Sequence, residues 1–417
     1  MTGKMQTLDR DELRRLFDLR SSYNAHSGGE YTDDPYPVWR ELRDRAPVHE
    51  GIVHHLTGYP GDAMFQGLPF PDRPHFSAFS FEACDAAFRD AEVFASAPLD
   101  DDVDLADVGV MNSMLSMGGT RHRRYRALVQ PSFVPAKAQW WIHNWIEQTV
   151  NLLIDNFVDD GKAELNVDFA AAIPVLTITG SFGVSVDQAL VIREALARDP
   201  VKVVQILQPI VAARRDSPAD DLISVLVGAE YTDDDGTSHR LTDPEIYSFA
   251  ILLLAAGSGT TWKQMGITLA ALLERPEAIG ALRVDRALVR PAIEESLRWM
   301  PTDPMFSRHV TRDVDFHGVH VPKGAVMHLC LGAANRDPTR WDRPDDYDLT
   351  RPPKPALAFG NGPHVCLGMH VARAEMAVGI TALLDRLPNL RLDPEADPPR
   401  YLGMYERGAT AIPVVFG

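Results

Sequence analysis

The chain has few cysteines, no excess of basic residues and no long apolar run. Its 417 residues include three cysteines, Cys84, Cys330 and Cys366, and 41 Lys and Arg against 58 Asp and Glu, a net charge of −17. Three scattered cysteines exclude a disulfide scaffold and suit a reducing compartment. The acidic balance gives no support to nucleic acid or an anionic membrane as the main partner. No segment approaches the roughly 20 apolar residues that cross a bilayer, and Met1–Leu16 has no apolar signal stretch, so we expect a cytoplasmic protein.

Internal repeats and long Gly/Ser linkers are also absent, and 45% of the residues are hydrophobic, which is enough for a sizeable core. Most of the chain follows the helical period, with strand-like patches around residues 308–314 and 326–331. We therefore expect a mainly helical fold with a small β-region. Residues 1–417 should form a single domain in which residues 1–33 are an N-terminal extension.

The clearest predicted element is a helix that begins at Thr242 with a capping-box pattern and continues to about Arg275. Residues 249–256 are apolar on every face, so this helix should be central and buried. Within it Gly257 and Gly259 each cost about 1 kcal/mol relative to alanine. Either another helix packs closely against these glycines, or the backbone there borders a groove for a small or flat ligand.

The most informative segment is a loop with the sequence Phe359-Gly360-Asn361-Gly362-Pro363-His364-Val365-Cys366-Leu367-Gly368. Glycines at 360 and 362 allow positive φ, so that the amide groups of the loop can turn toward the sulfur of Cys366. A helical pattern follows from about Leu367, and the N-terminus of a helix favours a thiolate, the form of cysteine that binds metals. Gly368 would let that helix approach a large planar ligand closely.

Three interpretations of Cys366 follow from the residues alone. A free cysteine is most often a buried structural residue. His364, Cys366 and His370 lie close enough in sequence for a zinc site, but no nearby Cys or carboxylate completes a familiar set. A thiolate bound to haem iron needs one protein ligand and a flat apolar slot. The paired glycines of the loop and those of the buried helix fit the third interpretation best.

The cysteine loop resembles the haem-binding signature of the cytochrome P-450 family, Phe-Gly-x-Gly-x-His-x-Cys-x-Gly, at every fixed position. Other segments match the family in the same order along the chain: His122-x-x-x-Arg126, Ala256-Gly257-x-x-Thr260-Thr261, Glu295-x-x-Arg298, Arg308 and Asn335-Arg336-Asp337-Pro338. The resemblance runs from about Asp34 to Phe416 and is closest to the soluble bacterial members. It implies the family's mainly helical triangular-prism fold and one haem b.

The resemblance also implies the site residues. Cys366 would be the proximal ligand of the haem iron. The haem propionates, as buried carboxylates, would need the charged or hydrogen-bonding partners His122, Arg126, Arg308 and His364. The remaining residues that would border the haem are Ala256, Gly257, Phe359, Gly360 and Gly368.

Thr260 matches the family's hydroxyl that helps to deliver protons to iron-bound dioxygen. The family usually has an acidic residue immediately before this threonine, and here that position is Gly259. Without that carboxylate, ordered water, Ser258 or a group on the substrate would have to supply the proton.

Two further departures from the family lead to expectations about the structure. The segment between Gly183 and Arg214, where the family has two lid helices, looks short, so we expect a reduced lid and a more open pocket. Asp346 stands where a basic residue often completes the Glu-Arg network, and Arg343 is the expected substitute.

The resemblance implies a monooxygenase that inserts one atom of O₂ into a hydrophobic small molecule, with electrons from NAD(P)H through a reductase and a ferredoxin. The basic run Arg121–Arg126 would dock the acidic ferredoxin. Substrate would contact residues 105–117, 302–306 and 406–411 and the helix face at Leu252, Ala255 and Ala256. Gly259 leaves two alternatives open: a peroxide-driven oxygenase or peroxidase, and a non-catalytic haem-binding sensor or carrier.

Overall fold

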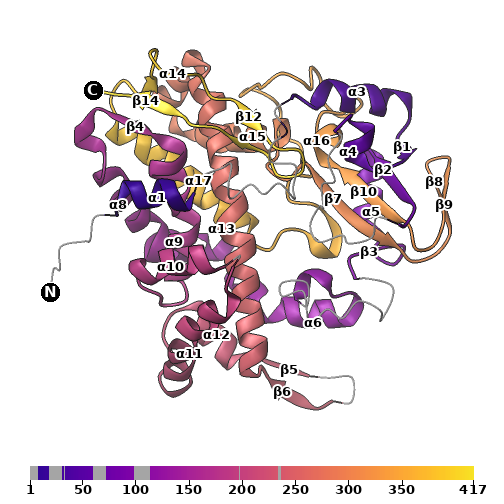
Figure 1. Ribbon diagram of the computed structural model, residues 1–417, viewed down its shortest axis with the longest axis horizontal. Coiled ribbons are helices and arrows are strands. Elements are labelled where there is room, and N and C mark those ends of the chain that lie inside the picture. The colour runs from indigo at the N-terminus through magenta and orange to yellow at the C-terminus, as the bar shows by residue number, and fades with distance from the viewer. Residues whose placement is uncertain are drawn as a thin grey trace.

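A computed structural model of the chain describes residues 8–17, 31, 33–59, 72–97, 113–196, 198–232 and 236–417. Most of these residues are helical, and the strands are short (Figure 1). The fold is mainly α with a small β-region, as the sequence predicts. Residues 105–112 of the loop that we expect to contact substrate lie outside the described residues.

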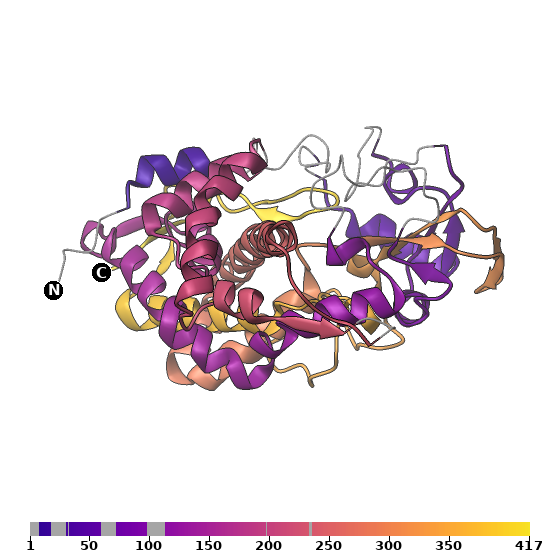
Figure 2. The same ribbon diagram turned by 90° about the horizontal axis from the view of Figure 1, so that it is seen from below.

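The elements are arranged around one long helix, α13 (Asp243–Leu273), with most helices on one side and most strands on the other (Figure 1; Figure 2, which looks nearly along α13). The helices before α13 are α1 (Arg10–Leu16), α3 (Tyr36–Arg45), α4 (Val53–Leu56), α5 (Phe81–Arg89), α6 (Gly119–Val129), α7 (Ala138–Trp141), α8 (Glu147–Asp155), α9 (Ala172–Gly180), α10 (Val186–Ala195), α11 (Pro200–Asp216) and α12 (Leu222–Gly228). Those after it are α14 (Pro276–Val284), α15 (Val289–Trp299), α16 (Leu331–Ala334) and α17 (Met369–Arg386).

The central helix forms for the reasons that its sequence predicts. A capping box joins Thr242 to Glu245, whose Oε2 accepts a hydrogen bond from the Thr242 backbone N–H at 2.8 Å. At 1.5 Å per residue its 31 residues span about 45 Å. The helix packs against α9, α14, α15 and α17, and its second half is buried throughout. The prediction of a central buried helix is confirmed.

The largest sheet has five strands in the order β1-β2-β10-β7-β3, and β2 and β10 are parallel. The predicted patches correspond to β7 with β8 and to β10. The strands of this sheet are β1 (Val48–Glu50), β2 (His75–Ala78), β10 (Val326–Cys330), β7 (Met305–Val310) and β3 (Phe94–Ala95). The smaller sheets join β11 (Arg391–Leu392), β14 (Pro413–Val415) and β4 (Lys162–Glu164); β12 (Tyr401–Leu402) and β13 (Gly408–Ala409); β5 (Glu230–Thr232) and β6 (Ser238–Arg240); and β8 (Val314–Phe316) and β9 (Val319–Val321).

The segment between Gly183 and Arg214 forms two helices, α10 and most of α11, so both expected lid helices are present, and the reduced length of the lid stays a prediction. Ser185 caps α10, because its side chain accepts a hydrogen bond from the Gln188 N–H. Asp199 caps the 17-residue helix α11 in the same way, and proline at the first position of α11 suits a helix start. These caps begin both helices with only a short connection between them, which is why the segment looks short.

Residues 8–17 of the expected N-terminal extension are part of the main core. Leu13 and Phe17 are fully buried in it. Arg10 and Arg14 both donate hydrogen bonds to Oδ2 of the buried Asp168, at 2.6 and 3.1 Å. The helix α1 is therefore fixed to the helical side of the molecule by both apolar and charged contacts.

Candidate functional site

The cysteine loop is held against α5 by close backbone contact. Gly360 and Gly362 have φ values of +67° and +70°, and a Cβ at Gly362 would lie 2.2 Å from the Phe88 carbonyl oxygen. Only glycine fits there. The Asn361 side-chain amide donates a hydrogen bond to Asp85 Oδ1 at 2.6 Å, and the Cys366 N–H donates to the Phe359 carbonyl at 2.9 Å. The loop that the sequence singles out is thus a rigid turn that leads into α17.

The Cys366 thiol opens onto interior space. Its side chain is exposed, yet surrounding protein raises its pKa, an effect that the Gly368 backbone opposes. A Cβ at Gly368 would meet nothing within 4 Å, so there is room beside the start of α17. Burial therefore opposes the thiolate that we expect from the helix N-terminus. A bound metal cation would reverse that balance, because coordination deprotonates a thiol.

The central helix presents Thr260 and Ala256 on one open face. Ala256 is exposed although it lies midway along a buried helix, and the Thr260 hydroxyl donates a hydrogen bond to the Ala256 carbonyl at 3.3 Å. Ser258 lies on the opposite face, because two residues along a helix turn the side chain by about 200°. It is 1% exposed, and its hydroxyl has no hydrogen-bond partner in the described part of the chain. The structure does not bring Ser258 together with Thr260.

The two glycines of this helix have different neighbours. A Cβ at Gly257 would contact the Ile178 side chain of α9 at 3.8 Å, so close helix packing accounts for this glycine. A Cβ at Gly259 would lie 3.7 Å from Oε1 of Glu406, which forms an ion pair with Lys263. A carboxylate from the C-terminal loop therefore lies where the family's acidic side chain is missing. Sequence reasoning placed Glu406 near substrate but gave no sign of this contact.

Four basic side chains gather beside the cysteine loop. The rings of His122 and His364 stack with their centroids 3.8 Å apart. Burial lowers the pKa of His122 to about 4, that of His364 to about 3 and that of Arg308 to about 10, and it also lowers the pKa of Arg126. Neither Arg126 nor Arg308 makes an ion pair with any described residue. The two half-buried guanidinium groups, beside two neutral histidines, fit an anionic ligand, and these four residues are the predicted partners of the haem propionates.

The donor set fits haem better than zinc. The described residues contain no group of three or more His, Cys, Asp or Glu side chains that could hold a metal ion, so His364, Cys366 and His370 gain no support as a zinc site. A planar group with an iron centre and two carboxylates requires an accessible thiol, free space and cations, and the chain offers the Cys366 thiol, the space beside Gly368 and two half-buried arginines that form no ion pair with any described residue. The Phe359 ring, which packs under the Arg373 guanidinium at 4.6 Å, adds an apolar edge.

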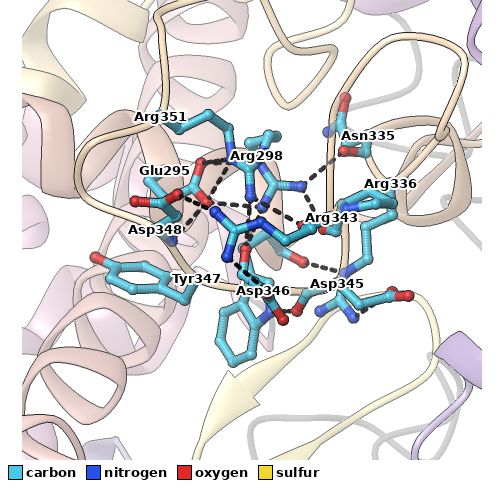
Figure 3. Close-up of polar contacts among 12 residues, drawn as sticks. Glu295, Arg298, Asn335, Arg336, Arg343, Asp345, Asp346, Tyr347, Asp348 and Arg351 are labelled. Carbon is cyan, nitrogen blue, oxygen red and sulfur yellow. Dashed lines mark hydrogen bonds and ion pairs between the residues drawn. The ribbon is translucent and has the colours of Figure 1, made fainter.

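A buried charge network supports the segment that precedes the cysteine loop (Figure 3). The Glu295 carboxylate accepts hydrogen bonds from Arg298 at 2.8 Å and from Arg351 Nε at 3.0 Å. Arg343, the substitute that we expected, is 64% exposed and pairs with Asp346 and Asp348 instead. The prediction of Arg343 is wrong because its φ of +42° places it at a surface turn, whereas the chain returns to Glu295 at Arg351.

The family model for cytochrome P450 matches residues 192–404. Over 392 residues the chain is 30% identical to the biotin biosynthesis cytochrome P450 of Bacillus subtilis, which covers 88% of this chain and 93% of that relative. The chain belongs to the cytochrome P450 family. It is also 36% identical over 323 residues to the nocardicin C N-oxygenase of Nocardia uniformis, with 73% of this chain and 79% of the relative covered.

Solved structures agree with this assignment. The structure of P450BioI in complex with an acyl carrier protein that bears hexadec-9Z-enoic acid has a TM-score of 0.77 and 30% identity, and the match covers 92% of this chain and 99% of that one. The polyketide synthase cytochrome P450 PksS of Bacillus subtilis has a TM-score of 0.80 at 25% identity, over 94% and 100% of the two chains. The P450 is therefore an oxidoreductase of the monooxygenase type, and its family implies a haem-iron cofactor. None of the helices in the described ranges is long and apolar enough to cross a membrane.

Proposed function

We propose that this P450 is a haem b monooxygenase in which the Cys366 thiolate is the axial iron ligand. It inserts one atom of O₂ into an organic small molecule. The observation that carries the proposal is the accessible Cys366 thiol on a loop that its glycines hold in place, beside the half-buried Arg126 and Arg308, which have no ion-pair partner among the described residues. When bound, the haem iron supplies the activation of oxygen.

The residues of the chain have distinct roles in this proposal. Arg126, Arg308, His122 and His364 hold the haem propionates, and Phe359, Gly360 and Gly368 border the haem on the cysteine side. The small side chain of Ala256 leaves space on the open face of α13. The Thr260 hydroxyl is the proton donor on that face. Ser258 and Gly257 have no direct part, since Ser258 is buried on the opposite face and Gly257 packs against α9.

The electrons are proposed to come from NAD(P)H through a ferredoxin reductase and a ferredoxin. The helix α6 carries exposed Arg121 and Arg123, and the stacking of His122 on His364 places this helix directly beside the cysteine loop. A basic face at that position on an acidic protein suits docking of an acidic redox protein. The scattered free cysteines support a reducing, cytoplasmic location.

Glu406 weakens the case for the two alternatives. A peroxide-driven oxygenase and a non-catalytic haem carrier both rest on the missing acid at Gly259, and a carboxylate now lies beside that position. Consumption of NAD(P)H with a surrogate reductase and ferredoxin, stimulated by a bound substrate, separates the monooxygenase from both. Turnover with peroxide alone would favour the first alternative, and no turnover with either would favour the second.

The absorption spectrum of the dithionite-reduced protein under carbon monoxide tests the axial ligand. We expect a strongly red-shifted Soret band that is lost in Cys366→Ser. The matched control is Cys84→Ser, since Cys84 is a buried residue of α5 and its thiol donates to the Ala78 carbonyl, a contact that serine can keep. A protein without haem, or a carbonyl spectrum typical of histidine ligation, would overturn the proposal.

A further inference from the structure

In the proposed function, the Thr260 hydroxyl needs a source of protons. Insertion of one atom of O₂ into a substrate reduces the other atom to water and consumes two electrons and two protons in each turnover. A hydroxyl that gives up a proton has to regain one, because an alkoxide does not persist at neutral pH. The Ser258 hydroxyl is 1% exposed on the opposite face of α13, and Gly259 has no side chain. The residues that precede Thr260 therefore offer it no acid.

Glu406 of the C-terminal loop lies beside this point of the helix. A Cβ at Gly259 would lie 3.7 Å from Glu406 Oε1, and no other described atom from outside α13 lies within 4 Å of that position. At about 100° per residue, Gly259 and Thr260 lie on either side of the exposed Ala256 around the helix axis. Glu406 and Thr260 therefore border the same open face of α13.

The Glu406 side chain contacts both the buried helix and solvent. It forms an ion pair with Lys263 of α13, which is 4% exposed, whereas the Glu406 side chain is 22% exposed. Arg193 of α10 and Asp303 also act electrostatically on Glu406, and their effects oppose each other because their charges are opposite. The ion pair holds the carboxylate at the helix, and its exposed part reaches water, the source of protons.

The backbone around Glu406 is fixed to α13. Gly403 has a φ of +96°, and a Cβ there would lie 2.1 Å from the Glu406 carbonyl oxygen, so the turn that presents Glu406 requires glycine. The Arg407 N–H donates to the Thr302 carbonyl at 2.6 Å, and the Thr302 N–H donates to Gln264 Oε1 of α13 at 2.8 Å. The position of the carboxylate beside the helix is thus a built feature of the fold.

We infer that Glu406 returns protons to the Thr260 hydroxyl during turnover. The inference rests on the proposed function and adds a positioning residue to it, since Glu406 acts through Thr260. Glu406 takes a proton from solvent on its exposed side and passes it through a water molecule to the Thr260 oxygen, as Thr260 gives its own proton to the open face. One proton moves from solvent to the open face, no electron is transferred, and the carboxylate is restored.

The rate of NAD(P)H consumption with saturating surrogate reductase and ferredoxin, in H₂O and in D₂O, tests the inference. Reduction of O₂ to peroxide or water consumes protons even without substrate. We expect Glu406→Gln to slow consumption by about tenfold to a hundredfold and to increase the solvent isotope effect, because an amide is not an acid. The exposed control Glu395→Gln should match the wild type.

A relocated carboxylate separates proton transfer from a structural role of Glu406. A side chain at Gly259 would meet Glu406 at an ordinary contact distance, so the position has room for one. Gly259→Asp, introduced together with Glu406→Gln, should restore most of the rate, because it returns a carboxylate to the same place. An unchanged rate in Glu406→Gln, or a loss that Gly259→Asp does not reverse, would overturn the inference.

Infrared spectra of the reduced protein under carbon monoxide give a readout that does not depend on turnover. The C–O stretch responds to charged and hydrogen-bonding groups near the bound gas. We expect the band to shift in Glu406→Gln and to stay at the wild-type frequency in Glu395→Gln. An unshifted band in Glu406→Gln would contradict the placement of this carboxylate on the open face.

Two further controls keep the outcomes distinct. Glu406→Gln leaves the buried Lys263 without its carboxylate, so Lys263→Gln/Glu406→Gln, which removes both charges, replaces it if the single variant does not fold. The Soret band of each carbonyl sample reports the axial ligand. A thiolate spectrum with no effect of Glu406→Gln overturns only this inference, and the expected effects without a thiolate spectrum overturn only the proposed function.

Discussion

At the scale of single residues, Glu295 shows that the position of the loop before Cys366 depends on which arginine contacts a buried carboxylate. Its two oxygens are shared between Arg298 and Arg351, and its Oε1 also accepts the Asp348 N–H at 2.9 Å. Arg351 further donates to the carbonyls of Arg343 and Asp346, both at 3.0 Å. One side chain thus neutralises a buried charge and fixes the loop that leads toward Cys366.

Arg351→Ala and Arg343→Ala form a matched pair on this loop. We expect Arg351→Ala to lower the free energy of unfolding by about 3 kcal/mol, because it removes one of two cations from a buried carboxylate. Arg343→Ala should change it by less than about 1 kcal/mol, because its partners are surface groups. Urea unfolding of both variants measures the difference. Equal losses of unfolding free energy would show that both arginines stabilise the protein equally, contrary to the contacts in Figure 3.

Glu375 provides a residue-scale test that depends on pH. It lies on α17, is 3% exposed, and burial raises its pKa to about 8. The unfolded chain releases this proton near pH 4.5 and the folded chain only near 8, so stability falls as the pH rises through this window. Glu375→Gln removes this titration. Between pH 5 and pH 8 its free energy of unfolding should therefore fall by a few kcal/mol less than that of the wild type. Thermal unfolding at pH 5 and pH 8 measures it, with the exposed Glu395→Gln as control; the same pH dependence in both variants would contradict the assignment.

At the scale of the element, α13 combines features that the sequence predicts with contacts that it does not. The capping box fixes its start, but the fit of its second half depends on neighbours that are distant in the chain. A Cβ at Gly266 would lie 2.5 Å from Oδ1 of Asn166. The Asn166 amide cannot move away freely, because it donates to the carbonyls of Ala409 and Thr410 at 2.8 and 3.1 Å.

Gly266→Ala and Gly280→Ala test this dependence with the same chemical change in two helices. Gly280 is exposed on α14, and a Cβ there meets nothing within 4 Å, so Gly280→Ala should stabilise the protein by about 1 kcal/mol through helix propensity. Gly266→Ala should destabilise it by about 1–3 kcal/mol, because overpacking displaces Asn166. The free energy of unfolding decides between the two directions. A stabilising Gly266→Ala would mean that the Asn166 contacts carry little energy.

At the scale of the whole molecule, a net charge of −17 contrasts with the basic helix α6 beside the cysteine loop. A local basic face on an acidic protein repels acidic proteins elsewhere and orients them at one place. The orientation of an acidic partner therefore depends on the charge of the whole molecule as well as on α6.

Reduction by an acidic surrogate ferredoxin should therefore depend on salt. We expect the rate to fall by about tenfold between about 0.05 M and 0.5 M NaCl, because screening shortens the range of the attraction. Arg121→Gln should lower the low-salt rate and weaken the salt dependence. Stopped-flow reduction measures both, with dithionite, which needs no docked protein, as the control. A rate independent of salt would argue against docking at α6.

The sequence by itself determined the elements and chemical signals that depend on neighbours in the chain. The capping box of α13, the glycines of the cysteine loop and the Glu295–Arg298 pair are local patterns, because backbone conformation and helix spacing act over a few residues. The family motifs predicted Cys366 and the four basic residues as site residues for the same reason. Even the lid helices had local caps, at Ser185 and Asp199, which the sequence analysis did not use.

Only the tertiary structure decided which distant side chains meet. Arg351 in place of Arg343 at Glu295 and Glu406 beside Gly259 each join segments whose approach depends on packing and loop closure. Local propensity carries no information on such contacts. It likewise could not show that Ser258 turns away from Thr260, because which face of a buried helix is open depends on what packs against it. The elements were therefore predictable, and these long-range contacts were not.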